Sequence, residues 1–144
     1  MKTASLMLLA LLITAGGYAQ NDSYRNTNGI AIKGYDPVGY FLQSKAQEGS
    51  DLFTYEWSGS KWKFISQANL DSFKAAPIKY APKFGGFCAY GCSENHKSPT
   101  DPNAWTIVDN RLYLNYNLKV KEMWVKDTAN RIKAANEYWL SLKK

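Results

Sequence analysis

Alternating aromatic residues constrain the fold of this chain more than any other feature of its sequence. Every second residue of the segments 53–57 and 62–64 is Phe, Tyr or Trp, and the turn sequence Ser58-Gly59-Ser60 lies between the two segments. Residues two apart lie on one face of a β-strand, and Gly between two such runs is typical of a hairpin. The sequence therefore predicts an antiparallel hairpin with one aromatic face.

A second hairpin is predicted further along the chain, from segments 105–108 and 111–116. Asp109-Asn110 lies between them, and both residue types tolerate the left-handed backbone that a two-residue hairpin turn needs. A short strand at 30–32 precedes both hairpins. Antiparallel hairpins interrupted by helices indicate an α+β domain rather than a parallel sheet.

Several short helices are predicted between and after the hairpins. Asp36-Pro37 is a helix-start signal for a turn or two ending near Leu42, and Ser66 is a candidate N-cap for a helix over 68–76. Asn117 caps a predicted helix carrying Val120, Met123 and Trp124. Two further helices are predicted over 87–95 and 128–142. The predicted fold is thus α+β, a small antiparallel sheet from two hairpins packed with several short helices.

The first nineteen residues have the pattern of a secretory signal peptide. A positively charged start, Met1-Lys2, precedes the apolar run 6–13, which is shorter than the roughly 20 residues that span a bilayer. Gly17 and Ala19 are small residues where a signal peptidase cuts, so cleavage is expected after Ala19. The alternative is that the apolar run is a buried N-terminal helix. An export signal predicts a periplasmic or secreted protein, and no later run is long enough to span a membrane.

The chain after this cut has the length of one domain. We expect 1–19 to be the signal peptide, 20–29 a flexible leader and 30–142 a single domain. The whole chain carries a net charge of +6, and the basic excess lies mostly after residue 118, as on a solvated helix face. An exported protein without a basic stripe of interleaved aromatics is not expected to bind nucleic acid.

The two cysteines and the single histidine of the chain fall close together. Cys88, Cys92 and His96 are spaced four and four apart, so an intact helix would place all three on one face. Two thiolates and an imidazole favour a soft metal ion such as copper or zinc. The three residues are therefore a candidate metal site.

Other interpretations of these residues remain open. A lone pair of cysteines in an exported protein usually forms a disulfide, and Gly91 would permit the kink that this bridge needs inside a helix. Cys88 and Cys92 are alternatively two buried, inert thiols, and His96 a solvated surface histidine. In these cases the chain is a structural domain, or it binds a small ligand in an aromatic pocket, and the candidate lining residues for that pocket are Tyr35, Tyr40, Phe84, Tyr90 and Trp105.

No catalytic constellation is evident in the sequence. It contains no Gly-x-Ser-x-Gly element, no His-Glu-x-x-His element and no phosphate-cradling loop. Asp36, Asp101 and Asp109 occupy turn or cap positions. Whether the chain is an enzyme stays uncertain, and the absence of an activated nucleophile other than Cys88 argues against it.

Several segments together resemble the exported bacterial branch of the YHS domain family. They are Gly34-Tyr35-Asp36-Pro37-Val38, Trp62-Lys63-Phe64, Gly85-Gly86-Phe87-Cys88-Ala89 and Asp101-Pro102-Asn103-Ala104-Trp105. The resemblance covers about residues 30 to 141 and implies a small domain suspected of binding metal. In relatives that accompany copper-transporting ATPases, candidate cysteine ligands stand where this chain has Gly39, Ile65 and Asn69, so a metal site here would be relocated to Cys88, Cys92 and His96. Taken together, the sequence predicts an exported binding module of the cell envelope.

Overall fold

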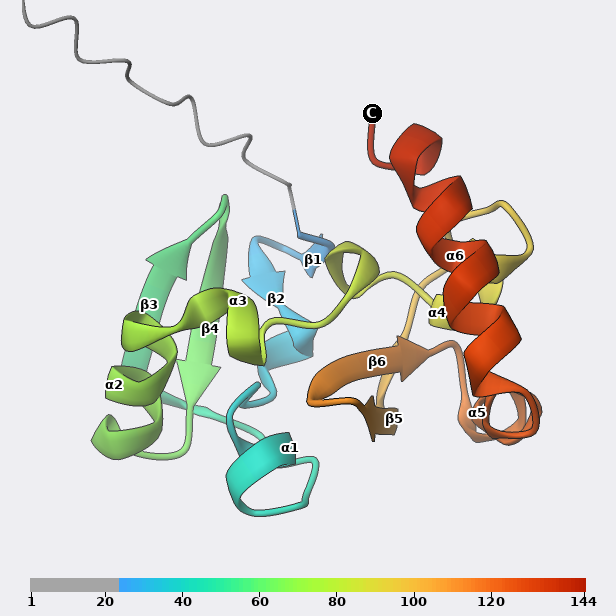
Figure 1. Cartoon of the computed structure of the whole chain (residues 1–144). Helices are drawn as coiled ribbons and strands as arrows, with labels where there is room; N and C mark the ends of the chain where they lie inside the picture. The colour runs from blue at the N-terminus through green and yellow to red at the C-terminus, as the bar shows by residue number, and fades with distance from the viewer. Residues whose placement is uncertain (1–23) are drawn as a thin grey trace, which may run out of the picture.

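A computed structural model of the chain describes residues 24–144 (Figure 1). The predicted signal peptide, 1–19, lies outside the described residues. Strand β1, Asn26–Thr27, lies in the segment expected to be a flexible leader. Within 24–144, no helix combines the length and the apolar character needed to cross a bilayer.

The first aromatic hairpin forms as predicted and belongs to a four-stranded sheet. Its strands are β3, Ser50–Trp57, and β4, Ser60–Phe64, with Tyr55 opposite Trp62. Strand β2, Ile30–Ala31, pairs with β4 in parallel and with β1 in antiparallel fashion, which gives the order β1-β2-β4-β3. The parallel pairing of β2 with β4 was not predicted, because it joins residues as far apart in sequence as Ile30 and Lys61.

The second hairpin forms a separate two-stranded sheet. Its strands are β5, Asp101–Val108, and β6, Arg111–Asn115. Asp109 and Asn110 have φ angles of 49° and 57°, so the predicted two-residue turn with left-handed backbone is confirmed. The α+β class is therefore confirmed, and the two hairpins form two small sheets rather than one.

Caps predicted from the sequence begin two of the helices. Ser66 Oγ accepts a hydrogen bond from the backbone N–H of Asn69, and Asn117 Oδ1 accepts one from Val120 N–H. A short helix that begins at Pro77 was not predicted. The α-helices are α1 Gly39–Leu42, α2 Gln67–Ala75, α3 Pro77–Tyr80, α4 Ala89–Ser93, α5 Leu118–Val125 and α6 Thr128–Leu142, and 3-10 turns lie at Ile32–Gly34 and Phe84–Gly86.

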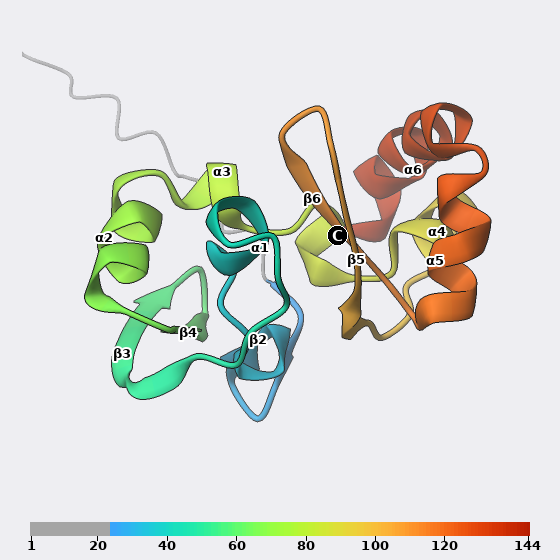
Figure 2. The same cartoon turned by 90° about the horizontal axis from the view of Figure 1, so that it is seen from below.

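The elements divide into two groups with the β5–β6 hairpin between them. Helices α2 and α3 lie near the four-stranded sheet on one side, and α4, α5 and α6 gather on the other (Figures 1 and 2). Each group has its own core. Trp62 and Phe73 pack in the first with ring centroids 4.9 Å apart, and Cys92, Trp124 and Ala135 are buried in the second. Helix α4, which contains Cys92 and follows Cys88, lies against α6 in the second group.

The helix expected over 87–95 is shorter than predicted. Helix α4 spans only Ala89–Ser93, Cys88 is its N-cap with φ −55° and ψ 116°, and Asn95 has a φ of 63° that ends the helical path. The prediction that Cys88, Cys92 and His96 share one face of a helix is therefore wrong, because only Cys92 lies within the helix.

Candidate functional site

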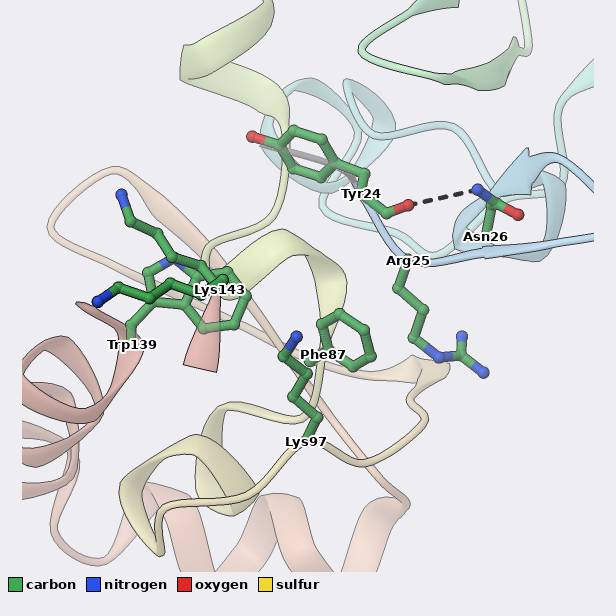
Figure 3. A pocket seen from close by; sticks show the side chains of 8 residues that line it. Tyr24, Arg25, Asn26, Phe87, Lys97, Trp139 and Lys143 are labelled. Atoms are coloured by element: carbon green, nitrogen blue, oxygen red, sulfur yellow. Dashed lines mark hydrogen bonds between the residues drawn. The ribbon is translucent and has the colours of Figure 1, made fainter. Parts of the chain in front are cut away.

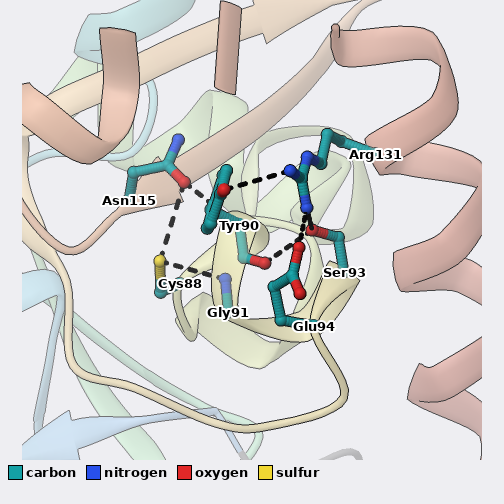
Figure 4. Close-up of polar contacts among 7 residues, drawn as sticks. All are labelled: Cys88, Tyr90, Gly91, Ser93, Glu94, Asn115 and Arg131. Carbon is teal, nitrogen blue, oxygen red and sulfur yellow. Dashed lines mark hydrogen bonds and ion pairs between the residues drawn. The ribbon is translucent and has the colours of Figure 1, made fainter. Parts of the chain in front are cut away.

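Cys88 begins helix α4 and is held there through its own sulfur. Its Sγ accepts a hydrogen bond from the backbone N–H of Gly91 at 3.4 Å, and its S–H donates to Oδ1 of Asn115 at 3.6 Å (Figure 4). Asn115 Oδ1 also accepts from the backbone N–H of Tyr90 at 3.0 Å, which fixes the amide orientation. The side chain of Cys88 is 2% exposed, yet it forms part of the lining of a pocket.

This pocket also contains the histidine. Its volume is about 240 Å³, and its lining residues are Cys88, Tyr90, Gly91, His96, Ser98, Tyr116 and Val120. The structure thus brings a thiol and an imidazole, which are eight positions apart in sequence, to one small cavity. We call this cavity the Cys88 pocket.

Cys92 lies elsewhere. Its side chain is fully buried in the second core, in the cluster that contains Phe84, Trp124 and Ala135. Burial, followed by the neighbouring Cys88, raises the pKa of the Cys92 thiol to about 12. Of the three predicted ligands, therefore, Cys88 and His96 share a pocket and Cys92 does not. Within residues 24–144, no group of three or more His, Cys, Asp and Glu side chains is placed to hold a metal ion.

His96 reaches the pocket because the chain turns back after helix α4. The backbone N–H of His96 donates to the carbonyl of Gly91 at 3.0 Å, and its ring Nδ1 lies 3.1 Å from Oγ of Ser98. When Nδ1 carries the proton and donates a hydrogen bond to Ser98 Oγ, Nε2 is left with a lone pair. A histidine ligand in a metal site is commonly oriented in this way through its other ring nitrogen.

Gly91 permits this close approach. A Cβ added at position 91 would lie 3.1 Å from Cε1 and 3.2 Å from Nδ1 of His96. These contacts are tighter than ordinary van der Waals separation, so an added methyl group would press on the imidazole and on the backbone oxygen of His96 at 3.3 Å. The small residue at this position therefore determines where the histidine ring lies.

Both thiols are free, and burial favours the protonated form of each. Cys88 and Cys92 form no disulfide, in line with the interpretation of two buried thiols. Burial raises the pKa of Cys88, and backbone hydrogen bonds from Gly91, Tyr116 and Tyr90 oppose that rise. These N–H groups would stabilise a thiolate, so the sulfur can become a ligand when a cation replaces its proton.

The positions at which the YHS resemblance implies cysteines surround one carboxylate. Asp36 is fully buried, and its Oδ1 accepts hydrogen bonds from the backbone N–H of Val38 at 2.8 Å and of Gly39 at 3.2 Å. Its Oδ2 accepts from the backbone N–H of Ile65 and from Nδ2 of Asn69, both at 2.8 Å. Gly39 is thus brought together with the nearby pair Ile65 and Asn69, but the three positions hold a hydrogen-bonded carboxylate and offer no thiolate for a soft metal.

Asn115 and Ser98 contribute to the site and were not predicted from the sequence. Asn115 is fully buried at the end of β6, and its Nδ2 has no hydrogen-bond partner among the described residues. A polar residue directly after the run Leu112-Tyr113-Leu114 was the only sequence signal for it. Ser98 lies in an irregular segment, where one sequence carries no signal of its contact with His96.

A second polar cluster ties helix α4 to helix α6. The guanidinium of Arg131 donates to Tyr90 Oη at 3.0 Å and to Ser93 Oγ at 3.1 Å, and it forms an ion pair with Glu94 (Figure 4). The guanidinium carbon also lies 4.1 Å from the centroid of the Tyr90 ring. Since Tyr90 lines the Cys88 pocket, this cluster fixes one wall of that pocket.

The five aromatic residues considered as a pocket do not line one cavity. Tyr40 and Trp105 pack in the first core with ring centroids 5.3 Å apart, and Phe84 packs in the second. Tyr35 lies partly buried against the first core, and Tyr90 belongs to the Cys88 pocket. Ordinary core packing therefore accounts for most of them.

Comparisons with protein-family models, with curated proteins and with solved structures gave no match to this chain.

Proposed function

We propose that this chain is an exported binding module of the cell envelope and that it holds one soft metal ion in the Cys88 pocket. The observation that carries the proposal is that Cys88 and His96, a thiol and an imidazole, line the same cavity. The apolar N-terminal run followed by Gly17 and Ala19 supports export, either to the periplasm or into the medium.

The ligands would be Sγ of Cys88 and Nε2 of His96. Ser98 orients the imidazole through Nδ1, and the N–H of Gly91 supports the sulfur. Between the two metals expected from the sequence, this set favours copper in its Cu(I) state. Structural zinc sites need four ligands in a tetrahedron, whereas soft thiolate donors select Cu(I).

The proposal revises the ligand set expected from the sequence, because Cys92 is buried in the second core. The resemblance to YHS domains implies cysteines at three positions that here donate hydrogen bonds to Asp36: Gly39, Ile65 and Asn69. These positions offer a soft metal ion no thiolate, so the proposed site lies at Cys88 and His96 instead.

A competition titration tests this proposal. The full chain is titrated anaerobically with Cu(I) against a chromophoric chelator, in parallel with the variants Cys88→Ser, His96→Gln and Cys92→Ala. We expect one-to-one binding that weakens by about tenfold or more in the first two variants and is unchanged in the third. Equal binding by all four proteins would remove the metal proposal and leave the cysteines as inert thiols.

A further inference from the structure

A second pocket lies between the start of the described chain and the end of helix α6 (Figure 3). Its volume is about 590 Å³, within the range of ordinary small-molecule sites. Residues from three distant parts of the sequence line it: Tyr24, Arg25, Asn26, Phe87, Lys97, Trp139, Lys143 and Lys144. We call it the basic pocket.

Positive charge dominates this lining. Arg25, Lys97, Lys143 and Lys144 are cationic, and no Asp or Glu is among the lining residues. The ion pairs described in residues 24–144 are Lys63 with Asp51 and Arg131 with Glu94, so none involves this pocket. Four cationic residues therefore line one cavity, and no Asp or Glu side chain among the lining residues balances them.

Arg25 is the most informative of these cations. It is half-buried, and burial lowers the pKa of its guanidinium. Its backbone N–H donates to the carbonyl of Gly85 at 2.7 Å, which anchors the residue at the pocket wall. A desolvated cation without a counter-ion is unfavourable, and an anion in the pocket would remove that cost.

Aromatic rings form the apolar part of the same cavity. The rings of Phe87 and Trp139 have centroids 6.3 Å apart, and the Lys97 ammonium lies 5.2 Å from the first and 5.9 Å from the second. Trp139 also packs edge-to-face on Phe84 with centroids 5.8 Å apart, so the second core holds it in place. A fixed aromatic surface bordered by cations suits a flat ring that carries a negative group.

We propose that the basic pocket binds a small organic anion with a planar ring, its negative group held by Arg25 and Lys97 and its ring packed against Phe87 and Trp139. The anion is a carboxylate or a phosphate, which these cations recognise by the same charge-assisted hydrogen bonds. This pocket is distinct from the proposed metal site, because the two pockets share no lining residue.

Isothermal titration calorimetry on the full chain tests this proposal with four probes: 2-naphthoate, 2-naphthyl phosphate, neutral 2-naphthalenemethanol and inorganic phosphate. We expect at least one aryl anion to bind about tenfold or more tightly than both the neutral alcohol and inorganic phosphate, and to lose affinity as salt is added. The aryl anion that binds more tightly identifies the preferred head group, carboxylate or phosphate. Equal affinity for the neutral alcohol, or for inorganic phosphate, would overturn the proposal.

Paired variants locate the site. The double variant Arg25→Gln, Lys97→Gln should lose about tenfold or more in affinity for the aryl anion. The matched double variant Lys126→Gln, Lys133→Gln removes the same charge from exposed positions outside the lining and should bind as the parent does. Equal losses in both would show a general charge effect and overturn the assignment. The indole N–H resonance of Trp139 should shift on binding, and an unchanged resonance would also contradict the site.

Discussion

Asn69 donates a hydrogen bond from Nδ2 to Oδ2 of Asp36 over 2.8 Å, and both side chains are buried. The contact joins helix α2 to the segment that begins helix α1. Together with the backbone N–H of Ile65 at the end of β4, it makes one carboxylate the meeting point of three elements in the first half of the domain.

The substitution Asp36→Asn should therefore destabilise the fold. The new amide nitrogen would face N–H groups whose hydrogen bonds the carboxylate oxygens now accept. Buried donors would then be left unpaired, at a cost of about 3 kcal/mol. Urea unfolding followed by circular dichroism measures the loss. Asp71→Asn, at an exposed position of α2, is the matched control and should change the free energy of unfolding by less than about 0.5 kcal/mol. Similar losses in both variants would show that the Asp36 contacts do not stabilise the fold.

Gly91→Ala should weaken Cu(I) binding with little effect on the fold. The added methyl group meets the His96 ring at 3.1 Å, so the imidazole must move away from the Cys88 pocket. We expect a loss of about tenfold in Cu(I) affinity in the competition titration. Gly39→Ala is the control, because its Cβ would find its nearest neighbour at 3.4 Å in ordinary contact. Unchanged Cu(I) affinity in the Gly91→Ala variant would argue that His96 is not a ligand.

The protein should lose stability as the pH rises above about 9. Burial raises the pKa of Cys92 from its ordinary value of 9.0 to about 12, so the unfolded chain releases this proton at a lower pH than the folded chain. The free energy of unfolding then falls between about pH 9 and 12, by at most about 1.4 kcal/mol per pH unit for this group. Burial also raises the pKa of Tyr40, which adds to the loss at the upper end.

Urea unfolding at a series of pH values from neutral to about 10.5 checks this slope. The Cys92→Ala variant lacks the thiol, so its free energy of unfolding should fall less steeply than that of the parent across this interval. Parallel curves for the two proteins would mean that Cys92 does not titrate differently in the folded and unfolded chains.

The export prediction concerns residues outside the described part of the chain. If a signal peptidase cuts after Ala19, protein recovered from the periplasm of a bacterial host should begin at Gln20, and mass spectrometry would show the loss of the first nineteen residues. A variant with Ala19→Asp, which places a charged residue at the expected cleavage site, should stay unprocessed. An intact N-terminus in the parent would contradict the signal-peptide interpretation.

Local signals explain which elements could be predicted from the sequence. Ser66 and Asn117 cap helices through contacts with residues three positions away, and the Asp109-Asn110 turn is equally local. The alternating aromatic residues of the β3–β4 hairpin form a pattern among nearby residues only. The same holds for the apolar residues of α6, which recur every three or four positions. These elements formed close to their predicted limits for that reason.

The candidate site could be predicted only in part, because tertiary contacts decide its geometry. Helix α4 ends at Ser93 where Arg131 of helix α6 takes part in its polar contacts, and Cys92 points to the core that Trp124 and Ala135 form. Spacing alone placed Cys88, Cys92 and His96 on one face. The contact between Cys88 and Asn115, 27 positions apart, has no local signature.

X-ray absorption at the copper edge of the one-to-one Cu(I) complex distinguishes sulfur from nitrogen ligands, so it tests whether Cys88 and His96 hold the metal. We expect one sulfur and one imidazole nitrogen in the spectrum of the parent protein, unchanged in the Cys92→Ala variant. A spectrum with two sulfur ligands that becomes one in Cys92→Ala would contradict this expectation, because both cysteines would then bind the metal and the Cys88 pocket would not be the site.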